Sequence, residues 1–334
     1  MRPGPATATF QTMADVWEAY GEELDGVEAH IRKNLDSSVT LVNTVSAHIL
    51  SSGGKRIRPL LLLLCARLCG NTSSDPQTLG SLVEFIHTAT LLHDDVVDDA
   101  DLRRGRQTAR KVWSNQISIL VGDYLYSHAM RQIVTFKNQA VNETLAEACS
   151  KMAEGEVLQL YHHGSIAMTE DDYIRIVEHK TASLIATSCR IGAIIGLASE
   201  EQQTALFRFG EYIGIAFQMA DDTLDYTANG ARLGKTLGQD LREGKITLPL
   251  LHLLQQCPEP DRQMIKDRLE TRTLSDTDLQ RIIALMQDYG SIAYAMDRAR
   301  AYVAAATRSL ALFNDSPAMR ALVIVADYMV NRDR

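Results

Sequence analysis

The sequence predicts an all-α protein, and three observations support this prediction. Apolar residues recur with the 3.6-residue period of a helix through most of the 334 residues. The alternating patterns that are typical of strands are hard to find. Hydrophobic residues make up 46% of the chain, enough for a substantial core, and proline occurs only 8 times. Because no Ser/Gly-rich linker divides the chain, we expect a single domain over residues 13–334 after a flexible tail of residues 1–12.

The first half of the chain is expected to form helices separated by short breaks. Helical patterning over residues 13–50 ends at residues 51–59, where two glycines release the chain and Pro59 suits the first turn of the next helix. The helix over residues 60–68 is apolar all round and should be buried. Further helices are expected after a loop at 70–75, over three stretches: from about Thr78, over 108–130 and over 138–155.

Capping signals mark helix starts in the second half. Thr169 and Asp172 fit a capping box, in which the threonine hydroxyl accepts a hydrogen bond from the amide three residues on. Similar signals at Ser199 and Ser275 open two more helices. Residues 226–245 hold four glycines and four basic residues. A long glycine-rich loop after a metal-type motif is often a mobile lid, so we expect one here.

Two acidic motifs each end an apolar helical run. In the first motif, the helical repeat stacks Asp94 and Asp98 one turn apart, with Asp95 beside them. Like charges one turn apart repel, so a cation is expected between them. A solvated acidic face would explain either motif alone, but two copies argue against that explanation. The second motif repeats the Asp-Asp-x-x-Asp spacing with Asp221, Asp222 and Asp225.

The residue types in these motifs favour magnesium over other metals. Carboxylates without histidine or cysteine partners are hard oxygen ligands, and Mg²⁺ typically binds through one or two of them plus substrate phosphates. Zinc would favour histidine or cysteine. His93 adjoins Asp94, as in some metal-dependent phosphohydrolases, but no matching set of histidines accompanies this pair.

Short basic stretches accompany both motifs. Arginine offers bidentate geometry to phosphate oxygens, and lysine offers a point charge. Any one of these residues alone could be an ordinary surface charge. Together with two acidic motifs they imply two bound anions, one bridged by metal and one held directly. The basic residues form three sets: Lys55, Arg56 and Arg58; Arg103, Arg104 and Arg106; Lys180, Lys235 and Lys245.

Composition excludes several other classes of protein. The net charge of −8 argues against a general nucleic-acid binder, which needs a basic surface. The scattered cysteines lack a Cys-x-x-Cys pair and indicate a reducing cytoplasmic location. The N-terminal residues lack the apolar core of a signal peptide, and the apolar run at 60–64 is too short to span a bilayer. Peripheral membrane contact remains open. The cysteines are Cys65, Cys69, Cys149, Cys189 and Cys257.

Apolar helices that line the same space would hold a greasy part of the substrate. A metal-bound diphosphate is a good leaving group, because the metal neutralises the charge that develops on it. The residues therefore suggest the ionisation of a prenyl-type diphosphate.

Four motifs resemble those of the trans-isoprenyl diphosphate synthases, the polyprenyl synthetase family. The likeness runs from about residue 25 to the C-terminus and is greatest to the octaprenyl-forming bacterial members, notably over 84–98, 152–159 and 244–250. It implies a bundle of antiparallel helices around a deep cavity, usually as a homodimer. The motifs are Gly53-Gly54-Lys55-Arg56-Ile57-Arg58-Pro59; Leu91-Leu-His-Asp-Asp-Val-Val-Asp98 with Arg103-Arg104-Gly105; Lys180-Thr181; and Phe217-Gln218 with Asp221-Asp222-x-x-Asp225.

The resemblance also implies roles for individual residues. Up to three Mg²⁺ ions would bridge the allylic diphosphate, held by Asp94, Asp98 and Asp221, with Asp95, Asp222 and Asp225 near them. Thr181 and Gln218 would steady the allylic cation or its diphosphate. The allylic diphosphate would contact Arg103, Lys180 and Lys235, and isopentenyl diphosphate would contact Lys55, Arg58, His87 and Arg104.

The residues one turn before the first motif bear on product length. Ala89 and Thr90 are small, whereas short-chain members of the family tend to have bulky aromatics there. We therefore expect a long product, about eight isoprene units by resemblance, for a quinone side chain such as that of ubiquinone. Close helix packing is an equal explanation for the small residues Ala89 and Thr90. Rival functions are a class I terpene cyclase, a farnesyl or geranylgeranyl diphosphate synthase, a phosphohydrolase and a non-catalytic partner subunit.

Overall fold

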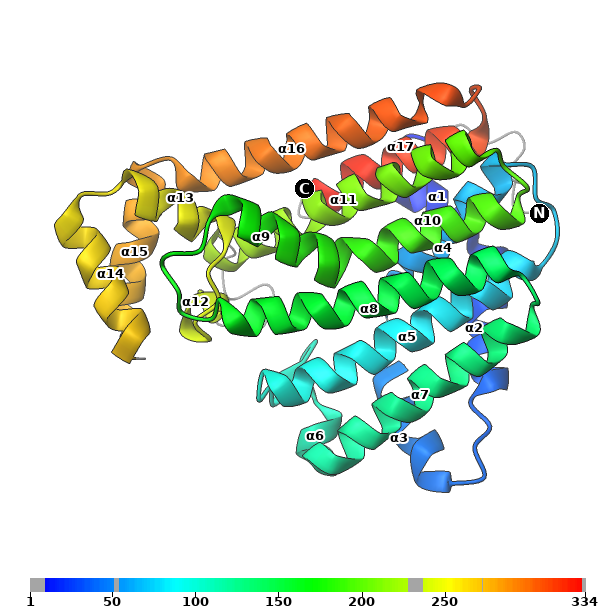
Figure 1. The fold of residues 1–334 in the computed structure, drawn as a ribbon, viewed down its shortest axis with the longest axis horizontal. Coiled ribbons are helices and arrows are strands. Elements are labelled where there is room, and N and C mark those ends of the chain that lie inside the picture. Colours follow the sequence, from blue (N-terminus) through cyan, green and yellow to red (C-terminus); the bar gives the residue numbers. More distant parts are fainter. Residues whose placement is uncertain (1–9, 51–53, 228–236, 272, 332–334) are drawn as a thin grey trace. The chain divides into compact units, whose positions relative to one another are not determined.

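The structure is a computed structural model that describes residues 10–50, 54–227, 237–271 and 273–331. Within these ranges the chain is helical apart from one short two-stranded ribbon, which confirms the all-α prediction (Figure 1). The single-domain assignment for 13–334 stays a prediction, and most of the expected tail, residues 1–9, lies outside the described residues. Contacts divide the chain into two compact units: unit 1 runs to Glu147 and adds 184–207 and 310–325, and unit 2 holds 148–183, 208–309 and the residues from 326.

Unit 1 is built around the buried helix α4 (Ile57–Leu68) and the long helix α5 (Asp75–Val97). Every residue from Leu60 to Ala66 is fully buried, as the uniformly apolar sequence predicts. Helix α5 packs against α4, α2 and α7 (Figure 1). The remaining helices wholly or largely in this unit are α1 (Met13–Ala19), α2 (Gly21–Asn34), α3 (Thr40–Leu50), α6 (Ala109–Val112), α7 (Asn115–Thr135) and α10 (Ser183–Ile195).

A tight antiparallel ribbon follows α5 and carries the basic residues of the first motif. Strand β1 (Leu102–Arg103) pairs with β2 (Arg106–Gln107), and Arg103 lies opposite Arg106. The two turn residues, Arg104 and Gly105, both have positive φ, of 52° and 75°. Such turns match the twist of short hairpins, and glycine adopts this conformation without steric cost. Strands of two residues are too short for an alternating sequence pattern to predict them.

Unit 2 has a core of aliphatic and aromatic side chains from many helices. Helix α9 (Glu170–Val177) runs into a π-helical turn, η2 (Glu178–Ala182). The other helices of the unit are α12 (Gln239–Arg242), α13 (Leu248–Gln256), α14 (Glu259–Thr271), α15 (Asp276–Asp288) and α16 (Ser291–Ser309). Helices α8 (Gln139–Tyr161), α11 (Glu200–Thr227) and α17 (Pro317–Val330) have residues in both units, and a 3₁₀ turn, Leu310–Leu312, follows α16.

The three expected capping signals are confirmed. Thr169 and Ser275 form complete capping boxes at the starts of α9 and α15. At the start of α11, the hydroxyl of Ser199 accepts from the amide of Gln202 at 3.3 Å, and the Gln202 side chain accepts from the amide of Ser199 at 3.1 Å. A fourth capping box, at Thr12 before α1, escaped the sequence analysis.

Two expected segments differ in the structure. The helix expected over 108–130 is two helices, because Ser114 interrupts it and caps α7 by accepting from the amide of Ile117 at 3.2 Å. The expected lid over 226–245 contains the short helix α12, while residues 228–236 lie outside the described residues. The apolar period over 108–130 predicts one continuous helix, and the cap that Ser114 forms divides it in two.

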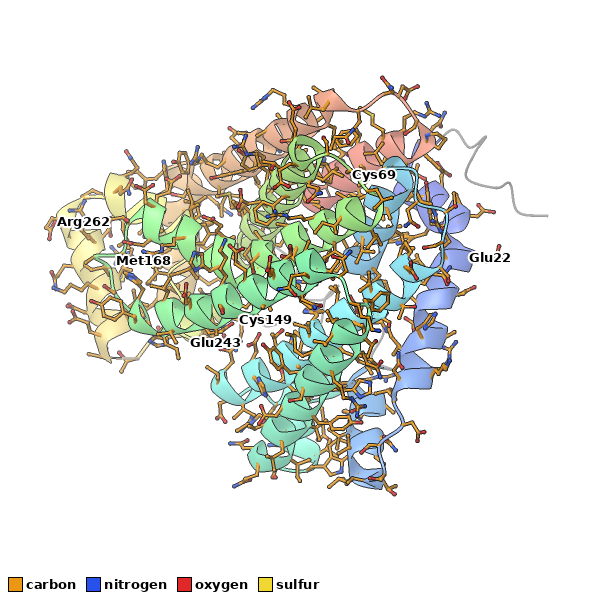
Figure 2. The ribbon with its side chains drawn as sticks, turned by 45° about the vertical axis from the view of Figure 1, so that its right-hand side comes forward. Glu22, Cys69, Cys149, Met168, Glu243 and Arg262 are labelled. Carbon is orange, nitrogen blue, oxygen red and sulfur yellow. The ribbon has the colours of Figure 1, made fainter. Side chains whose placement is uncertain are left out.

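The cysteine side chains are thiols that are buried or half-buried, as expected of core residues. Cys65 and Cys189 are fully buried in unit 1. Figure 2 labels Cys69, which ends α4, and Cys149, which lies on α8. Burial raises the pKa of the Cys65 thiol well above its usual value, so this thiol stays protonated and unreactive.

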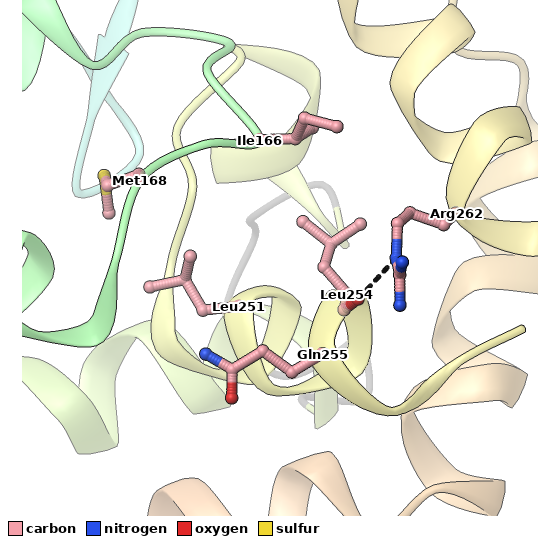
Figure 3. Close-up of a pocket in the computed structure, with 6 residues that line it drawn as sticks. All are labelled: Ile166, Met168, Leu251, Leu254, Gln255 and Arg262. Atoms are coloured by element: carbon pink, nitrogen blue, oxygen red, sulfur yellow. Dashed lines mark hydrogen bonds between the residues drawn. The ribbon is translucent and has the colours of Figure 1, made fainter. Parts of the chain in front are cut away.

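Unit 2 contains a hollow of about 380 Å³ beside the C-terminal end of α13 (Figure 3). Its charged residue, Arg262 of α14, donates from Nε to the carbonyl of Leu254 at 2.8 Å. The same guanidinium also donates to the carbonyl of Cys257 and to Glu259. The donors of Arg262 are thus engaged in capping the end of α13. It is lined by Ile166, Met168, Leu251, Leu254, Gln255 and Arg262.

Candidate functional site

A basic cluster gathers in unit 1 from three sequence segments. Gly54 lies against two arginines: a Cβ added there would be 3.4 Å from a guanidinium nitrogen of Arg104 and 3.5 Å from one of Arg56. Arg56 is held by two acids, Glu84 at 2.8 Å and Glu28 at 2.5 Å. The structure thus places Gly54 and Arg56 of the Gly-Gly-Lys-Arg motif beside Arg104, in the ribbon that follows α5. Arg56 and Arg104 both have left-handed backbone, with φ of 48° and 52°, a conformation that costs free energy for a non-glycine residue.

Arg58 has the features of an anion-binding residue. Its Nε–H is buried and has no hydrogen-bond partner among the described residues. Burial lowers the pKa of Arg58, and the charge of Arg104 lowers it further, while Glu84 opposes them. A partly buried guanidinium with a buried, unsatisfied N–H beside a second cation is costly, and an anion would relieve both penalties.

His87 lies among the same cations. Burial holds the pKa of His87 well below its usual value, and the charges of Arg58 and Arg104 lower it further. The imidazole is therefore neutral near pH 7, so that it can donate one hydrogen bond without adding charge. The structure brings together four of the predicted diphosphate-binding residues in this cluster: Arg58, His87, Arg103 and Arg104. Lys55 is exposed and immediately precedes Arg56 in the loop before α4.

The first acidic motif lies at the C-terminal end of α5. Asp98 caps the helix, and its amide donates to the carbonyl of Asp94 at 2.8 Å, so the two residues are stacked one turn apart as predicted. Both are partly exposed. Asp95 differs, because only 1% of it is exposed and its Oδ1 accepts from Nε of Arg103 at 2.8 Å. Burial raises the pKa of Asp95, and Arg103 opposes that rise. Asp95 thus positions Arg103.

The donor set of this helix end fits a hard divalent cation that arrives with its substrate. Among residues 10–50, 54–227, 237–271 and 273–331, no group of three or more acidic, histidine or cysteine side chains converges into a metal cage. Mg²⁺ does not need such a cage, since it keeps several waters and takes substrate phosphates as ligands. Asp94 and Asp98 could supply the one or two carboxylates that such an ion requires.

The second acidic motif lies near the end of α11 in unit 2, and its three carboxylates have different surroundings. Asp221 is partly exposed. Asp225 accepts from the backbone amide of Asp240, in the first turn of α12, at 3.0 Å. Asp222 is buried, and each of its oxygens accepts a hydrogen bond: from Tyr173 at 2.6 Å and from Gln218 at 2.7 Å. Burial raises the pKa of Asp222 to about 7, against those two hydrogen bonds.

Lys180 and Thr181 lie in the π-helical turn η2, a type of bulge that often occurs at functional sites. Gly155 of α8 makes room for this turn, because a Cβ there would be 2.6 Å from the backbone nitrogen of Lys180. The Lys180 ammonium pairs with Glu156 at 2.6 Å. The Thr181 hydroxyl donates to Oε1 of Gln218 at 2.9 Å, so these two predicted site residues are in contact.

The residues expected to govern product length lie on α5. Only 1% of Ala89 is exposed. Thr90 is partly exposed, and its hydroxyl donates to the carbonyl of His87 at 2.8 Å. One turn earlier, the fully buried Phe85 meets His128 of α7 edge-on, with ring centroids 5.8 Å apart.

Sequence reasoning missed several residues that hold the candidate site in place. Glu84 and Glu156 form ion pairs with Arg56 and Lys180 and lie within motif-like stretches, so their position was a usable signal. Tyr173 contacts Asp222 across 49 residues, and no local pattern marks it. Lys235, predicted to contact the allylic diphosphate, lies outside the described residues.

Comparison with known proteins assigns the family. The Polyprenyl synthetase family model matches residues 39–286, which cover both acidic motifs and the basic cluster. The chain belongs to the polyprenyl synthetase family. The predicted resemblance is thereby confirmed, and membership makes the chain a prenyltransferase.

Individual polyprenyl synthetases are similar over almost the whole chain. The octaprenyl diphosphate synthase of Escherichia coli (strain K12) is 40% identical over 317 residues, which cover 95% of this chain and 98% of that protein. A solved decaprenyl diphosphate synthase from Rhodobacter capsulatus is 41% identical with a TM-score of 0.92, covering 96% of this chain and 99% of that chain. A polyprenyl synthase from Caulobacter crescentus CB15, complexed with calcium and isoprenyl diphosphate, is 35% identical with a TM-score of 0.93, covering 98% of this chain and 100% of that chain.

The fold of these polyprenyl synthetases is all-helical, like that of the present chain. Within the part of the chain that the structure describes, no helix has both the length and the apolar character needed to cross a membrane.

Proposed function

We propose that the chain is a long-chain all-trans-polyprenyl diphosphate synthase, which adds isopentenyl diphosphate repeatedly to an allylic diphosphate such as farnesyl diphosphate. The observation that carries this proposal is the partly buried Arg58, whose buried Nε–H has no hydrogen-bond partner among the described residues, set among Arg104 and His87. Such a cluster suits a highly charged anion. Similarity to synthases of octaprenyl and decaprenyl diphosphate supports the long-chain assignment.

The proposed metal is Mg²⁺, with up to three ions bridging the allylic diphosphate. The calcium and isoprenyl diphosphate in the Caulobacter crescentus structure support a divalent ion in this family. When bound, the ions would neutralise the negative charge that develops on the leaving diphosphate. The residues that would hold them are Asp94, Asp98, Asp221, Asp222 and Asp225.

The chain's own residues would act on two diphosphates. Lys55, Arg58, His87 and Arg104 would hold isopentenyl diphosphate. Arg103, Lys180 and Lys235 would hold the allylic diphosphate, with Arg103 aligned by its ion pair to Asp95. The allylic C–O bond breaks, the isopentenyl double bond attacks the resulting cation, and a C–C bond forms. The proton that is then lost passes to the released diphosphate, while Thr181 and Gln218 steady the cation.

The proposed product is octaprenyl diphosphate, for use in a quinone side chain such as that of ubiquinone. The 40% identity to an octaprenyl diphosphate synthase supports this length. Small side chains at Ala89 and Thr90 would leave a path for the growing chain along α5. Replacement of Ala89 by Phe tests this idea directly: we expect shorter products from a protein that still unfolds cooperatively. Unchanged product length would show that Ala89 does not determine the length of the product.

We also propose a cytoplasmic homodimer that contacts membranes peripherally when its greasy product is released. Buried thiols support a reducing compartment. For the homodimer, helix α7 exposes Ile119, Leu120 and Val134, with exposed fractions of 40%, 61% and 58%. These positions fall within an arc of about 100° on one helix face, a pattern that favours a partner surface.

One incubation separates the proposal from its rivals. The protein is supplied with Mg²⁺, farnesyl diphosphate and labelled isopentenyl diphosphate, and the products are separated by chromatography. We expect labelled long-chain prenyl diphosphate. A terpene cyclase would release cyclic hydrocarbon without isopentenyl diphosphate, a phosphohydrolase would release phosphate from one substrate alone, and a farnesyl or geranylgeranyl diphosphate synthase would stop at short products. A non-catalytic subunit would form nothing by itself.

A further inference from the structure

We propose that Tyr173 is a positioning residue that fixes, through Asp222 and Gln218, the direction in which the Thr181 hydroxyl faces the reacting allylic group. The inference rests on the proposed prenyl-transfer function and adds to it a residue that no motif marks. All four side chains belong to unit 2, and the hydrogen bonds between them form one continuous chain.

The chain of hydrogen bonds links two helical segments at two levels. Tyr173 and Thr181 both lie on the continuous α9–η2 segment, eight residues apart, and Gln218 and Asp222 lie one turn apart on α11. At one level the Tyr173 hydroxyl donates to Asp222 at 2.6 Å; at the other the Thr181 hydroxyl donates to Gln218 at 2.9 Å. The bond from Gln218 to Asp222, at 2.7 Å, joins the levels.

The donor and acceptor of each hydrogen bond in this series are related to the carboxylate of Asp222. Gln218 donates from its NH₂ group to Oδ1 of Asp222 and accepts from the Thr181 hydroxyl on its carbonyl oxygen. The ionised form of Asp222 fixes this direction, because an ionised carboxylate can only accept. Thr181 must then donate its only proton to Gln218. The lone pairs of the Thr181 oxygen therefore remain for the substrate side, which is the polarity that stabilises a cation.

Tyr173 is the first donor in this series of hydrogen bonds. Only 3% of Tyr173 is exposed, and its hydroxyl is the donor to the Oδ2 atom of Asp222. Without that donor, a buried carboxylate oxygen loses its partner, and the carboxylate can turn to seek another. Gln218 would turn with it, so Thr181 would no longer have a fixed donor direction. Each oxygen of Asp222 accepts one of these hydrogen bonds, so Asp222 orients Gln218 in addition to its proposed place among the carboxylates that would hold metal.

The test compares two variants that each lose one tyrosine hydroxyl, one inside this series of hydrogen bonds and one elsewhere in unit 2. Tyr173→Phe keeps the ring and removes the donor. Tyr294→Phe is the control, because the Tyr294 hydroxyl also donates to a carboxylate at 2.6 Å, that of Glu170, outside the chain of bonds. The readouts are kcat and KM for farnesyl diphosphate, the ratio of farnesol to condensed product, and the affinities for Mn²⁺ and for a non-ionising thio analogue of farnesyl diphosphate.

We expect Tyr173→Phe to lower kcat by about tenfold or more and to raise the share of farnesol, because water captures a poorly held cation. Both affinities should stay within about twofold of wild type, and Tyr294→Phe should leave every readout unchanged. Unaltered kcat and farnesol share in Tyr173→Phe would overturn the proposal. So would a parallel loss of Mn²⁺ affinity, because it would show that Tyr173 serves metal binding.

A charge exchange provides the second test. Asp222→Asn alone offers an NH₂ group to Gln218, which must then flip and reverse Thr181, so kcat should fall. Adding Gln218→Glu restores an acceptor for both the introduced amide and the Thr181 hydroxyl. At saturating Mg²⁺ we expect the double variant to have a higher kcat than Asp222→Asn, because both variants lack the same carboxylate and differ only in the direction of the hydrogen bonds. A double variant no faster than Asp222→Asn would contradict the orientation role. Wild type is assayed in parallel: if it forms no prenyl product, the proposed function fails, whereas an active wild type with an unaffected Tyr173→Phe variant rejects this inference alone.

Discussion

At the scale of single residues, identical side chains in the two acidic motifs have different roles that only their surroundings reveal. Asp94 and Asp98 are partly exposed at the end of α5, whereas Asp95 is buried against Arg103 and Asp222 is buried between Tyr173 and Gln218. The sequence predicts which positions are acidic and how they are spaced. It does not predict burial, because Tyr173 and Arg103 reach these carboxylates through tertiary contacts.

Loss of a partly exposed carboxylate from either motif should abolish most activity. We expect Asp94→Ala and Asp221→Ala each to lower kcat by about two orders of magnitude. Each substitution removes a carboxylate proposed to hold the metal that neutralises the charge developing on the leaving diphosphate. Asp297→Ala is the control, because Asp297 is an exposed residue of α16 that pairs with Arg300. Near-normal turnover in either motif variant, with a cooperative thermal transition, would count against the metal assignment.

His87 should make stability depend on pH. In the folded chain the pKa of His87 is held well below the unfolded value of about 6.5, so below that pH the unfolded chain binds a proton that the folded chain does not. This contribution is present above pH 6.5 and is lost as the pH falls toward the folded pKa. The free energy of unfolding of wild type should therefore fall by up to about 1.4 kcal/mol per pH unit more than that of His87→Gln between pH 6.5 and 5. Equal slopes in denaturant titrations would contradict this.

At the scale of elements, the π-helical turn η2 depends on a glycine of another helix. Patterns in the sequence predicted a helix that begins at the capping box of Thr169. They could not predict the π-bulge, because it arises where α8 packs so closely that a Cβ at Gly155 would meet backbone at 2.6 Å. Likewise, Ser114 divided an apparently continuous apolar run into α6 and α7.

Replacing Gly155 by Ala should therefore destabilise the protein despite the better helix propensity of alanine. We expect a loss of about 1–3 kcal/mol from overpacking and a lower kcat, because Lys180 and Thr181 move with the turn. Gly26→Ala is a matched control inside α2, since its new Cβ would meet only the end of the flexible Gln77 side chain. That variant should be neutral or gain up to about 1 kcal/mol. Equal free energies of unfolding for the two variants would reject the packing argument.

At the scale of the whole molecule, the fold class and family follow from the sequence, because helical periodicity and spaced motifs are local properties. The contacts that assemble the basic cluster are not local: Glu84 reaches Arg56 across 28 residues. The exposed face of α7 is also a property of the folded chain, since periodicity cannot tell an exposed apolar stripe from a buried one.

That face predicts the oligomeric state. We expect wild type to be a dimer by light scattering, and Leu120→Asp combined with Val134→Asp to shift it to monomer, because charges would be buried without partners. Leu312→Asp, at a similarly exposed apolar residue in the turn after α16, should leave the mass unchanged. A dimer that survives both α7 substitutions would place the interface elsewhere.

The central claim is that this chain joins isopentenyl units to an allylic diphosphate with a divalent metal. The most direct measurement is the mass of the product that wild type forms from farnesyl diphosphate and labelled isopentenyl diphosphate, with Mg²⁺ or with a chelator. We predict about five isopentenyl units per farnesyl starter, as for octaprenyl diphosphate, with Mg²⁺ and none with the chelator. Unextended farnesyl diphosphate in the presence of Mg²⁺, or equal extension without it, would contradict the claim.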